Sequence, residues 1–366
     1  MKVRIPRGPL AAAMAWSASQ LDPKPTVPAR AGLLLEADGD TLTITGVDSN
    51  VTTRTVLAAD ILEPGRIVIP GRLAASVVGT YRSDLVDITM DDQRACLQAD
   101  RDRFLLTLLP VADYPTVPAS PEPDGTVPAA EFAEAVRQAV VAVDPTVAAE
   151  PWRGGIQLSA DGDRLTVWAT DRYRMAERSV PWGGADGVGA LVPGRALADA
   201  VKGMRQSGDL NLSLTGDTVG MSDTERFTTL TRIDETGRKD PHQFIPDGFT
   251  TEAVLPVAAL TAAVKRACLV AGDKKPKILL GFGEDDISVR AHGDDTGATA
   301  FDTVEGRHEH GDPLQIAFMP ANLLDGLTAI GTSEVRIGLT ANVRPALLHA
   351  VGDDTDYRYL VMPVRL

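Results

Sequence analysis

The sequence predicts an α+β fold in which one unit is repeated three times along 366 residues. Leu33–Ala59 and Ile156–Trp182 are nearly the same segment, and Ile278–Gly306 is a more divergent third copy. Each copy has an apolar run, a turn rich in acidic residues and glycine, and then alternating apolar and polar residues, which is typical of a β-hairpin. The copies start 123 and 122 residues apart, and self-similarity at a fixed period indicates a repeated fold.

Two helix-forming segments recur at the same places in every copy. An alanine-rich segment precedes each hairpin and opens with a proline, which is a helix start signal. These segments begin at Pro6, Pro128 and Pro256. After each hairpin, a short apolar strand is followed by a proline and then by a second helix-forming run, at residues 67–81, 190–204 and 316–330. Strands that begin at Arg103, Arg226 and Arg358 close the copies.

Each repeat is therefore expected to place two helices against antiparallel sheets. We predict three domains, at residues 1–120, 121–246 and 247–366. The proline-rich segment 110–128 predicts an extended linker between the first two, and Asp234–Gly248 predicts a second linker.

Composition limits the class of protein. The formal charge of −14 and the pI near 4.8, taken for the whole chain, argue against nucleic acid as a partner. Cys96 and Cys268 have no pairing motif, so we expect reduced core residues of a cytoplasmic protein. The sequence has no run of ~20 apolar residues, so we expect no membrane span. The N-terminus imitates a signal peptide, but equivalent segments recur inside the chain, so we expect it to be structural.

The charge is unevenly distributed. Six helix windows hold 13 Lys and Arg against six Asp and Glu, while the remaining chain holds 23 against 44. The windows are 7–24, 72–82, 129–143, 195–205, 257–277 and 321–332. Basic helices and acidic strands would make a protein with two electrostatic faces, although surface helices that merely carry solubilising cations would give the same count.

Motifs of catalysis are absent from the sequence. There is no phosphate-binding glycine loop, no dinucleotide fingerprint, no zinc-protease motif and no Cys-x-x-Cys pair. His308 and His310 could share one side of a strand and hold a metal, but no third ligand is near, which favours a solvated turn. We expect no enzyme, no cofactor and no metal, with an unrecognised active site as the alternative.

Several motifs together resemble one family over the whole chain. They are the Pro-Gly-Arg helix entries, Arg103-FLLTLLPVADYPTVP, Ala169-TDRYRMA and the closing Tyr359-LVMPVRL. In this combination and spacing, the chain resembles the bacterial DNA polymerase III beta subunit, the sliding clamp. The resemblance implies three DNA-clamp domains per chain, and two chains joined head to tail in a ring around double-stranded DNA. A ring holds DNA topologically, so weak contacts without sequence readout suffice.

The resemblance also implies DNA-binding residues on the inner helices and the rim. The candidates are Lys24, Arg72, Arg137, Trp152, Arg195, Lys202, Arg205, Lys265 and Arg266. For the cations the alternative is an ordinary exposed charge, and for Trp152 it is packing between domains.

A further implication is a hydrophobic pocket that takes short peptides from the polymerase III alpha subunit, the clamp loader and repair proteins. Its expected residues are Arg153, Thr170, Arg172, Tyr173, Arg174, Met175, Phe244, Val343, Pro345, Leu360, Val361, Met362, Pro363, Val364 and Arg365. A plain terminal strand with a buried apolar side is the alternative for Leu360 and Met362.

The chain departs from the family pattern near this pocket. Arg153 stands where an apolar residue is usual, Arg238–Pro241 replaces an aromatic-proline motif, and Lys274, Lys275 and Lys277 crowd the third repeat. Charge at an apolar cleft weakens apolar anchors. A divergent paralogue with altered partner or inhibitor binding, or a clamp-like scaffold that is never loaded on DNA, is therefore the alternative function.

The implied dimer contact joins an edge strand of the first repeat to a helix end of the third. Its candidates are Arg103, Phe104, Leu106, Leu108, Leu269 and Val270. Exposed edges invite pairing, and a ring covers them. Burial of Leu269 and Val270 within their own domain is the alternative.

Overall fold

The computed structural model describes the whole chain except residues 92, 145, 147–148, 237, 239, 273–275, 284–285, 294–296, 353–355 and 366. Every strand pairing in the described residues is antiparallel, which confirms the α+β class. The described residues form six α-helices: α1 (Arg7–Ser19), α2 (Gly71–Thr80), α3 (Ala129–Ala139), α4 (Gly194–Gly203), α5 (Val257–Ala271) and α6 (Pro320–Ile330).

The chain forms two compact units, the first from residues 1–130 and 182–232 and the second from residues 131–181 and 233–366. Each unit contains an outer repeat and part of the middle repeat. The cause is strand pairing between repeats: one strand of the middle repeat continues a sheet of the first, and another continues a sheet of the third. The three domain boundaries given above stay a prediction.

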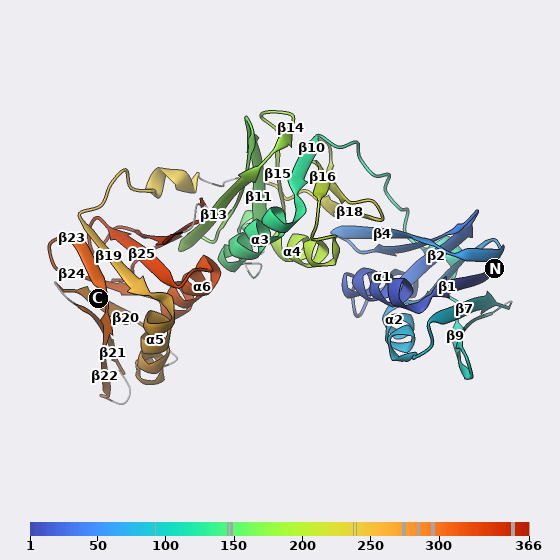
Figure 1. Cartoon of the computed structure of the whole chain (residues 1–366), viewed down its shortest axis with the longest axis horizontal. Coiled ribbons are helices and arrows are strands. Elements are labelled where there is room, and N and C mark those ends of the chain that lie inside the picture. Colours follow the sequence, from blue (N-terminus) through green and yellow to red (C-terminus); the bar gives the residue numbers. More distant parts are fainter. Residues whose placement is uncertain are drawn as a thin grey trace. The chain divides into compact units, whose positions relative to one another are not determined.

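The first unit has two sheets (Figure 1). One has the order β5-β1-β7-β8-β9, and the other β14-β10-β16-β17-β18-β4-β3-β2-β6. Their strands are β1 (Lys2–Pro6), β2 (Gly32–Asp38), β3 (Thr41–Val47), β4 (Val51–Ala58), β5 (Asp60–Glu63), β6 (Gly65–Pro70), β7 (Leu85–Met90), β8 (Arg94–Ala99), β9 (Asp102–Thr107), β10 (Gly125–Pro128), β14 (Gly183–Gly184), β16 (Asp209–Ser213), β17 (Thr218–Ser222) and β18 (Arg226–Thr231); β15 (Gly189–Pro193) leads into α4. Helices α1 and α2 pack together over the core that holds Leu10, Leu35 and Ile88.

The second unit has one long and one short sheet. The long sheet includes the order β11-β12-β13-β27-β26-β25-β19-β23, and the short sheet is β22-β21-β20-β24. Their strands are β11 (Gly155–Asp161), β12 (Arg164–Thr170), β13 (Arg174–Pro181), β19 (Thr251–Pro256), β20 (Ile278–Phe282), β21 (Asp286–His292), β22 (Thr299–Glu305), β23 (Arg307–Gly311), β24 (Leu314–Phe318), β25 (Glu334–Leu339), β26 (Ala346–Ala350) and β27 (Arg358–Val361). Helix α5 packs on β21 and β22, with Leu260 and Val264 buried.

The repeated hairpins are confirmed, and each extends into a third antiparallel strand. Gly39 and Gly162 have φ angles of 56° and 57° at the tips of the first two, a left-handed conformation that glycine adopts without a steric cost. Residues 284 and 285 of the third tip lie outside the described residues.

The first predicted linker belongs to the first unit and the second linker to the second unit, and each contains a short 3-10 helix. Val111–Asp113 (η2) lies in the first linker, where the buried Tyr114 donates its hydroxyl to the Thr45 carbonyl at 2.8 Å. Pro241–Phe244 (η5) lies in the second, within the stretch drawn in yellow in Figure 1.

Three expectations need correction or qualification. The helices end earlier than their windows, so they hold seven Lys and Arg against four Asp and Glu, and much of the basic excess follows the helix ends. His308 and His310 lie in β23 instead of a solvated turn, because residues 307–311 pair with β19. Cys96 is buried and Cys268 is partly exposed, and both are free. In the described part, no helix has the length and hydropathy to cross a membrane.

Candidate functional site

The second unit has an apolar cavity of about 390 Å³. Its lining residues come from four places: the end of β12 with the start of β13, the 3-10 helix Pro151–Gly154 (η4), η5, and the terminal strand β27 with the residue after it. They are Trp152, Thr170, Arg172, Arg174, Met175, Pro241, Phe244, Leu360 and Met362. Met175 and Leu360 are paired across β13 and β27 and buried with Leu347, so they form the rigid part of the wall.

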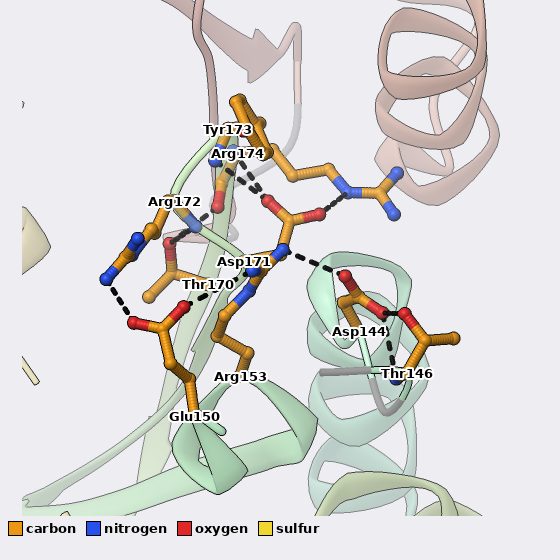
Figure 2. Close-up of polar contacts among 9 residues, drawn as sticks. All are labelled: Asp144, Thr146, Glu150, Arg153, Thr170, Asp171, Arg172, Tyr173 and Arg174. Atoms are coloured by element: carbon orange, nitrogen blue, oxygen red, sulfur yellow. Dashed lines mark hydrogen bonds and ion pairs between the residues drawn. The ribbon is translucent and has the colours of Figure 1, made fainter. Parts of the chain in front are cut away.

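The turn from Thr170 to Arg174 is fixed by side-chain bonds to its own backbone (Figure 2). The Asp171 carboxylate accepts from the amides of Tyr173 and Arg174 at 2.9 and 3.0 Å. The Thr170 hydroxyl donates to the Arg174 carbonyl at 2.7 Å and accepts from the Arg172 amide at 3.2 Å. The turn forces Arg172 to a φ of 80°, a left-handed conformation that disfavours a side chain.

Arg174 is a lining cation with fixed partners. Its guanidinium donates to Asp171 at 2.9 Å and to Asp325 of α6 at 2.5 Å. Burial alone would lower the pKa of Arg174, but the neighbouring Tyr359 and the two carboxylates outweigh it and raise that pKa. Arg174 therefore stays charged and ties the turn to α6.

Arg153 does not line the cavity, although its neighbour Trp152 does. Its guanidinium points to the carboxylates of Asp144, at 2.8 Å, and Glu150, at 3.4 Å (Figure 2). Its backbone amide donates to the Glu150 carbonyl at 3.0 Å, and its carbonyl accepts from the Asp144 amide at 2.8 Å. The pKa of Asp144 is lowered, first by hydrogen bonds from Thr146 and then by Arg153. The charge expected at the cleft is thus compensated inside the loop.

Trp152 is buried and lines the cavity. The Arg172 guanidinium lies 5.6 Å from the centroid of its ring and also pairs with Glu150. This contact lies within one repeat, so it is not the packing between domains that was the alternative for Trp152. DNA contact by Trp152 stays a prediction, and the sequence did not place this residue at the pocket. Pro241 was likewise missed as a lining residue; its signal was the proline next to the charged Arg238–Asp240 segment.

Arg238 also lies away from the apolar cavity. It donates to the Gln157 side chain at 2.7 Å, pairs with Glu235 and stacks 4.7 Å from the centroid of Trp168. Lys277 donates to the Arg365 carbonyl at 2.7 Å, and Lys274 and Lys275 lie outside the described residues. The charged side chains of Arg153, Arg238 and Lys277, which the resemblance did not predict, therefore all have local partners.

A second cavity of about 590 Å³ contains other predicted pocket residues. Val343, Pro363, Val364 and Arg365 line it. Tyr173 is 55 % exposed beside the first cavity, while Pro345 and Val361 are buried; with Arg153, these three line neither cavity. Binding of peptides by any of these residues stays a prediction.

The predicted DNA-binding cations are exposed, but several already have a partner. Lys24, Arg72, Arg137, Arg195, Lys202, Arg205, Lys265 and Arg266 are all exposed. Lys202 pairs with Asp199 at 2.8 Å, and Arg266 pairs with Asp302 at 2.5 Å. Arg137 pairs with Glu134 at 2.6 Å and donates to the Ala329 carbonyl of α6 at 3.3 Å, so it supports the contact between α3 and α6.

The predicted dimer residues lie on two exposed features. Strand β9 is an edge strand, with Phe104 43 % exposed, and Leu269 of α5 is 86 % exposed. Leu106 is buried in its own core, whereas the neighbouring Leu105, which was not a candidate, is 47 % exposed. Arg103 donates to the Cys96 sulfur at 3.0 Å, and Leu108 and Val270 are half-buried.

The described residues contain no cluster of three His, Cys, Asp or Glu with a geometry for a metal ion. His310 instead faces Glu252 at 3.4 Å within the sheet.

Comparison with known proteins covers the chain from end to end. Family models of the DNA polymerase III beta subunit match residues 1–118 (N-terminal domain), 126–236 (central domain) and 242–365 (C-terminal domain). The chain is 36 % identical to the beta sliding clamp of Streptomyces coelicolor, covering 100 % of both chains. It is 33 % identical to the beta sliding clamp homolog GriR of Streptomyces muensis, covering 100 % of this chain and 99 % of the relative.

Solved structures agree with the sequence comparison. The DNA polymerase III beta subunit from Pseudomonas aeruginosa matches with a TM-score of 0.91 at 26 % identity, and the same organism's clamp bound to griselimycin with 0.92 at 27 %, each covering 100 % of both chains. The predicted family and its three clamp domains are confirmed: this chain belongs to the DNA polymerase III beta subunit family, the beta sliding clamps of DNA replication, which are non-catalytic accessory subunits of the polymerase.

Proposed function

We propose that the chain is a DNA sliding clamp that encircles double-stranded DNA as a homodimer and tethers replication proteins through its apolar cavity. The observation that carries the proposal is the 390 Å³ cavity, built on the terminal strand and the Thr170–Arg174 turn. Its apolar wall with a few fixed polar groups is the kind of site that takes an apolar anchor of a linear peptide. The partners are peptides of the polymerase III alpha subunit, the clamp loader and other replication and repair proteins, in the cytoplasm.

Within this proposal, the buried and the exposed parts of the site have different tasks. Met175 and Leu360 are buried apolar groups on paired strands, so they provide a preformed surface for the anchor. Arg174, already bound to two carboxylates, holds the turn and would not need to desolvate again. Phe244 is 47 % exposed and would lose water when a peptide covers it.

Retention on DNA would come from ring closure, and exposed cations such as Arg72, Arg195 and Lys265 would supply only a weak attraction to phosphates. The edge strand β9 of one chain and the end of α5 of the other would close the ring. Leu269, 86 % exposed, and the partly exposed Phe104 are apolar groups that such an interface would cover.

Loading on circular DNA tests the proposal. The clamp loader and ATP are added with nicked circular plasmid, and bound protein is followed by gel filtration before and after the plasmid is cut once. A topological clamp stays on the circle and leaves the linear form by sliding off its ends. Equal retention on circular and linear DNA, or none on either, would contradict ring function; peptide binding with no DNA retention would indicate the scaffold alternative.

A divergent paralogue with altered inhibitor binding is the second candidate, and Arg172 favours it. Its guanidinium covers one region of the cavity wall at Trp152, which an apolar inhibitor would need to displace. The similarity to a griselimycin-bound clamp makes griselimycin a suitable probe. This candidate predicts weaker griselimycin binding to this chain than to the Pseudomonas aeruginosa clamp in parallel calorimetry; equal affinity would remove it.

A further inference from the structure

The second linker is fixed to the long sheet by one histidine. His242 lies in η5, between the cavity residues Pro241 and Phe244. Its Nε2 faces a carboxylate oxygen of Glu177 on β13, and its Nδ1 lies 2.6 Å from a carboxylate oxygen of Asp240. Glu177 is 1 % exposed, so the linker reaches a buried charge.

Both ring nitrogens of His242 therefore face carboxylate oxygens. A neutral imidazole has one N–H and one acceptor nitrogen, so it can donate to Glu177 or to Asp240 but not to both. The imidazolium ion has two N–H groups and satisfies both carboxylates. The arrangement fits the protonated ring, and the loss of one proton would set a nitrogen lone pair against a carboxylate oxygen.

The same contact joins two walls of the cavity. Pro241 precedes His242, and Phe244 follows two residues later. Glu177 lies two residues after Met175 on β13, and in a strand such residues have the same orientation. The pair between His242 and Glu177 thus holds the wall from η5 against the strand that supplies the opposite wall.

We propose that His242 is a positioning residue of the peptide-binding cavity, and that its proton couples peptide affinity to pH by fixing Pro241 and Phe244 in place. This inference rests on the proposed peptide-binding function and adds a regulator to it.

Other charged and aromatic side chains surround His242 and Glu177. Arg358 of β27 pairs with the second oxygen of Glu177, so the buried carboxylate keeps one cation when His242 is neutral. Trp168 of β12 contacts the imidazole edge to face, with ring centroids 5.2 Å apart, and Arg238 covers the same indole. Asp161 of β11 and Glu235 of the linker share the surface hollow beside His242. His349 of β26 lies opposite Arg358 in the sheet register.

The direction of the coupling follows from these contacts. The hydrogen bond with Glu177 raises the pKa of His242, although burial opposes it, and Asp240 adds to the rise. Burial would raise the pKa of Glu177, but His242 and Arg358 outweigh it and lower that pKa. A raised histidine pKa means that the stabilising contact is complete below the unfolded pKa, near 6.5, and is lost as pH rises through the folded pKa. Peptide affinity should therefore fall at alkaline pH.

A peptide titration tests the inference. The probe is an apolar-anchored peptide with blocked ends and no titratable side chain, measured by fluorescence anisotropy from pH 6.0 to 9.0. For the unchanged protein we expect affinity to fall about fivefold, the lower end of ordinary coupling between linked sites. His242→Gln, which keeps one hydrogen bond but no charge, should bind weakly at all pH values without a slope. His349→Gln is the matched control and should keep the slope.

Two outcomes would overturn the inference: an affinity of the unchanged protein that does not depend on pH, or the same slope in His242→Gln. If the peptide binds at no pH, the proposed function fails, and the positioning role of His242 is then tested by the protection of the linker from a protease. The ratio of protease cleavage within residues 238–248 in the unchanged protein to that in His242→Gln should rise from pH 6 to 9. A constant ratio, or an NMR titration of His242 with an unraised midpoint, would refute the positioning role.

Discussion

The guanidinium of Arg172 lies over the indole of Trp152, 5.6 Å from the ring centroid, although the Arg172 backbone has a φ of 80°. The residue is kept in an unfavourable conformation because the Thr170–Arg174 turn requires it, and its side chain gains the ring and Glu150 as partners. Two substitutions separate these effects.

Arg172→Ala should lower stability, because it loses both side-chain contacts and keeps the strained backbone. Arg172→Gly loses the same contacts but relieves the strain, so it should be more stable than Arg172→Ala by about 1 kcal/mol. Denaturant unfolding of the two variants measures the difference. If they unfold at the same midpoint, the left-handed conformation of Arg172 carries no cost. Both variants should bind griselimycin more tightly than the unchanged chain, because each uncovers Trp152.

Arg153→Leu should destabilise the chain by about 1–3 kcal/mol, even though the resemblance predicted an apolar residue here. Leucine would leave the partly buried Asp144 without its cation, and Glu150 with Arg172 alone. Thermal unfolding and the affinity for an anchor peptide measure the effect, since η4 carries Trp152. Arg164→Leu, which removes an exposed pair with Asp356, is the control and should change stability by less than about 1 kcal/mol. A gain of stability in Arg153→Leu would contradict the loop-fixing role.

The sequence predicted the repeats and their hairpins because both depend on local patterns. Alternation and an Asp-Gly turn specify a hairpin wherever they occur, as at Gly39 and Gly162. The orientation of Arg153 could not be predicted this way. It depends on Asp144 and Glu150, whose carboxylates pair with the guanidinium, so a residue predicted for the pocket does not line the cavity.

The sequence also could not predict which side chains of an all-apolar strand segment are buried. In β9 the side chains of Phe104, Leu105 and Leu106 are all apolar, so no alternation reveals which of them is buried. Tertiary packing buries Leu106 and exposes the other two. The predicted helix windows were too long for a related reason. Several Lys and Arg residues follow the ends of the helices in the sequence, so the windows counted them as helical and overestimated the basic excess of the helices.

Dimer formation should depend on Leu269 and not on an equally apolar exposed residue elsewhere. Leu269→Asp places a charge where the proposed interface would bury it, so the protein should sediment as a 38.8 kDa monomer at concentrations where the unchanged chain is dimeric. Leu73→Asp, at a residue of α2 that is 53 % exposed, is the control and should leave the dimer intact. A dimer in both variants would exclude the end of α5 from the interface. At dilutions where the unchanged chain is also monomeric, both variants should keep its unfolding midpoint, because neither side chain belongs to a core.

DNA attraction should distinguish Lys265 from Arg137, although both are helix cations. Both side chains are exposed, but Arg137 is held by Glu134 and the Ala329 carbonyl. Lys265→Gln should weaken the binding of loaded protein to DNA and reduce the dependence of log affinity on log salt by about one for each phosphate that the lysine neutralises. Arg137→Gln should leave that slope unchanged and instead lower the unfolding midpoint slightly, because it removes one of two hydrogen bonds from α3 to the Ala329 carbonyl and leaves the one from Gln138. Should Arg137→Gln reduce the salt slope as much as Lys265→Gln, the ion pair with Glu134 would have to open on DNA, and Arg137 would then be a phosphate ligand.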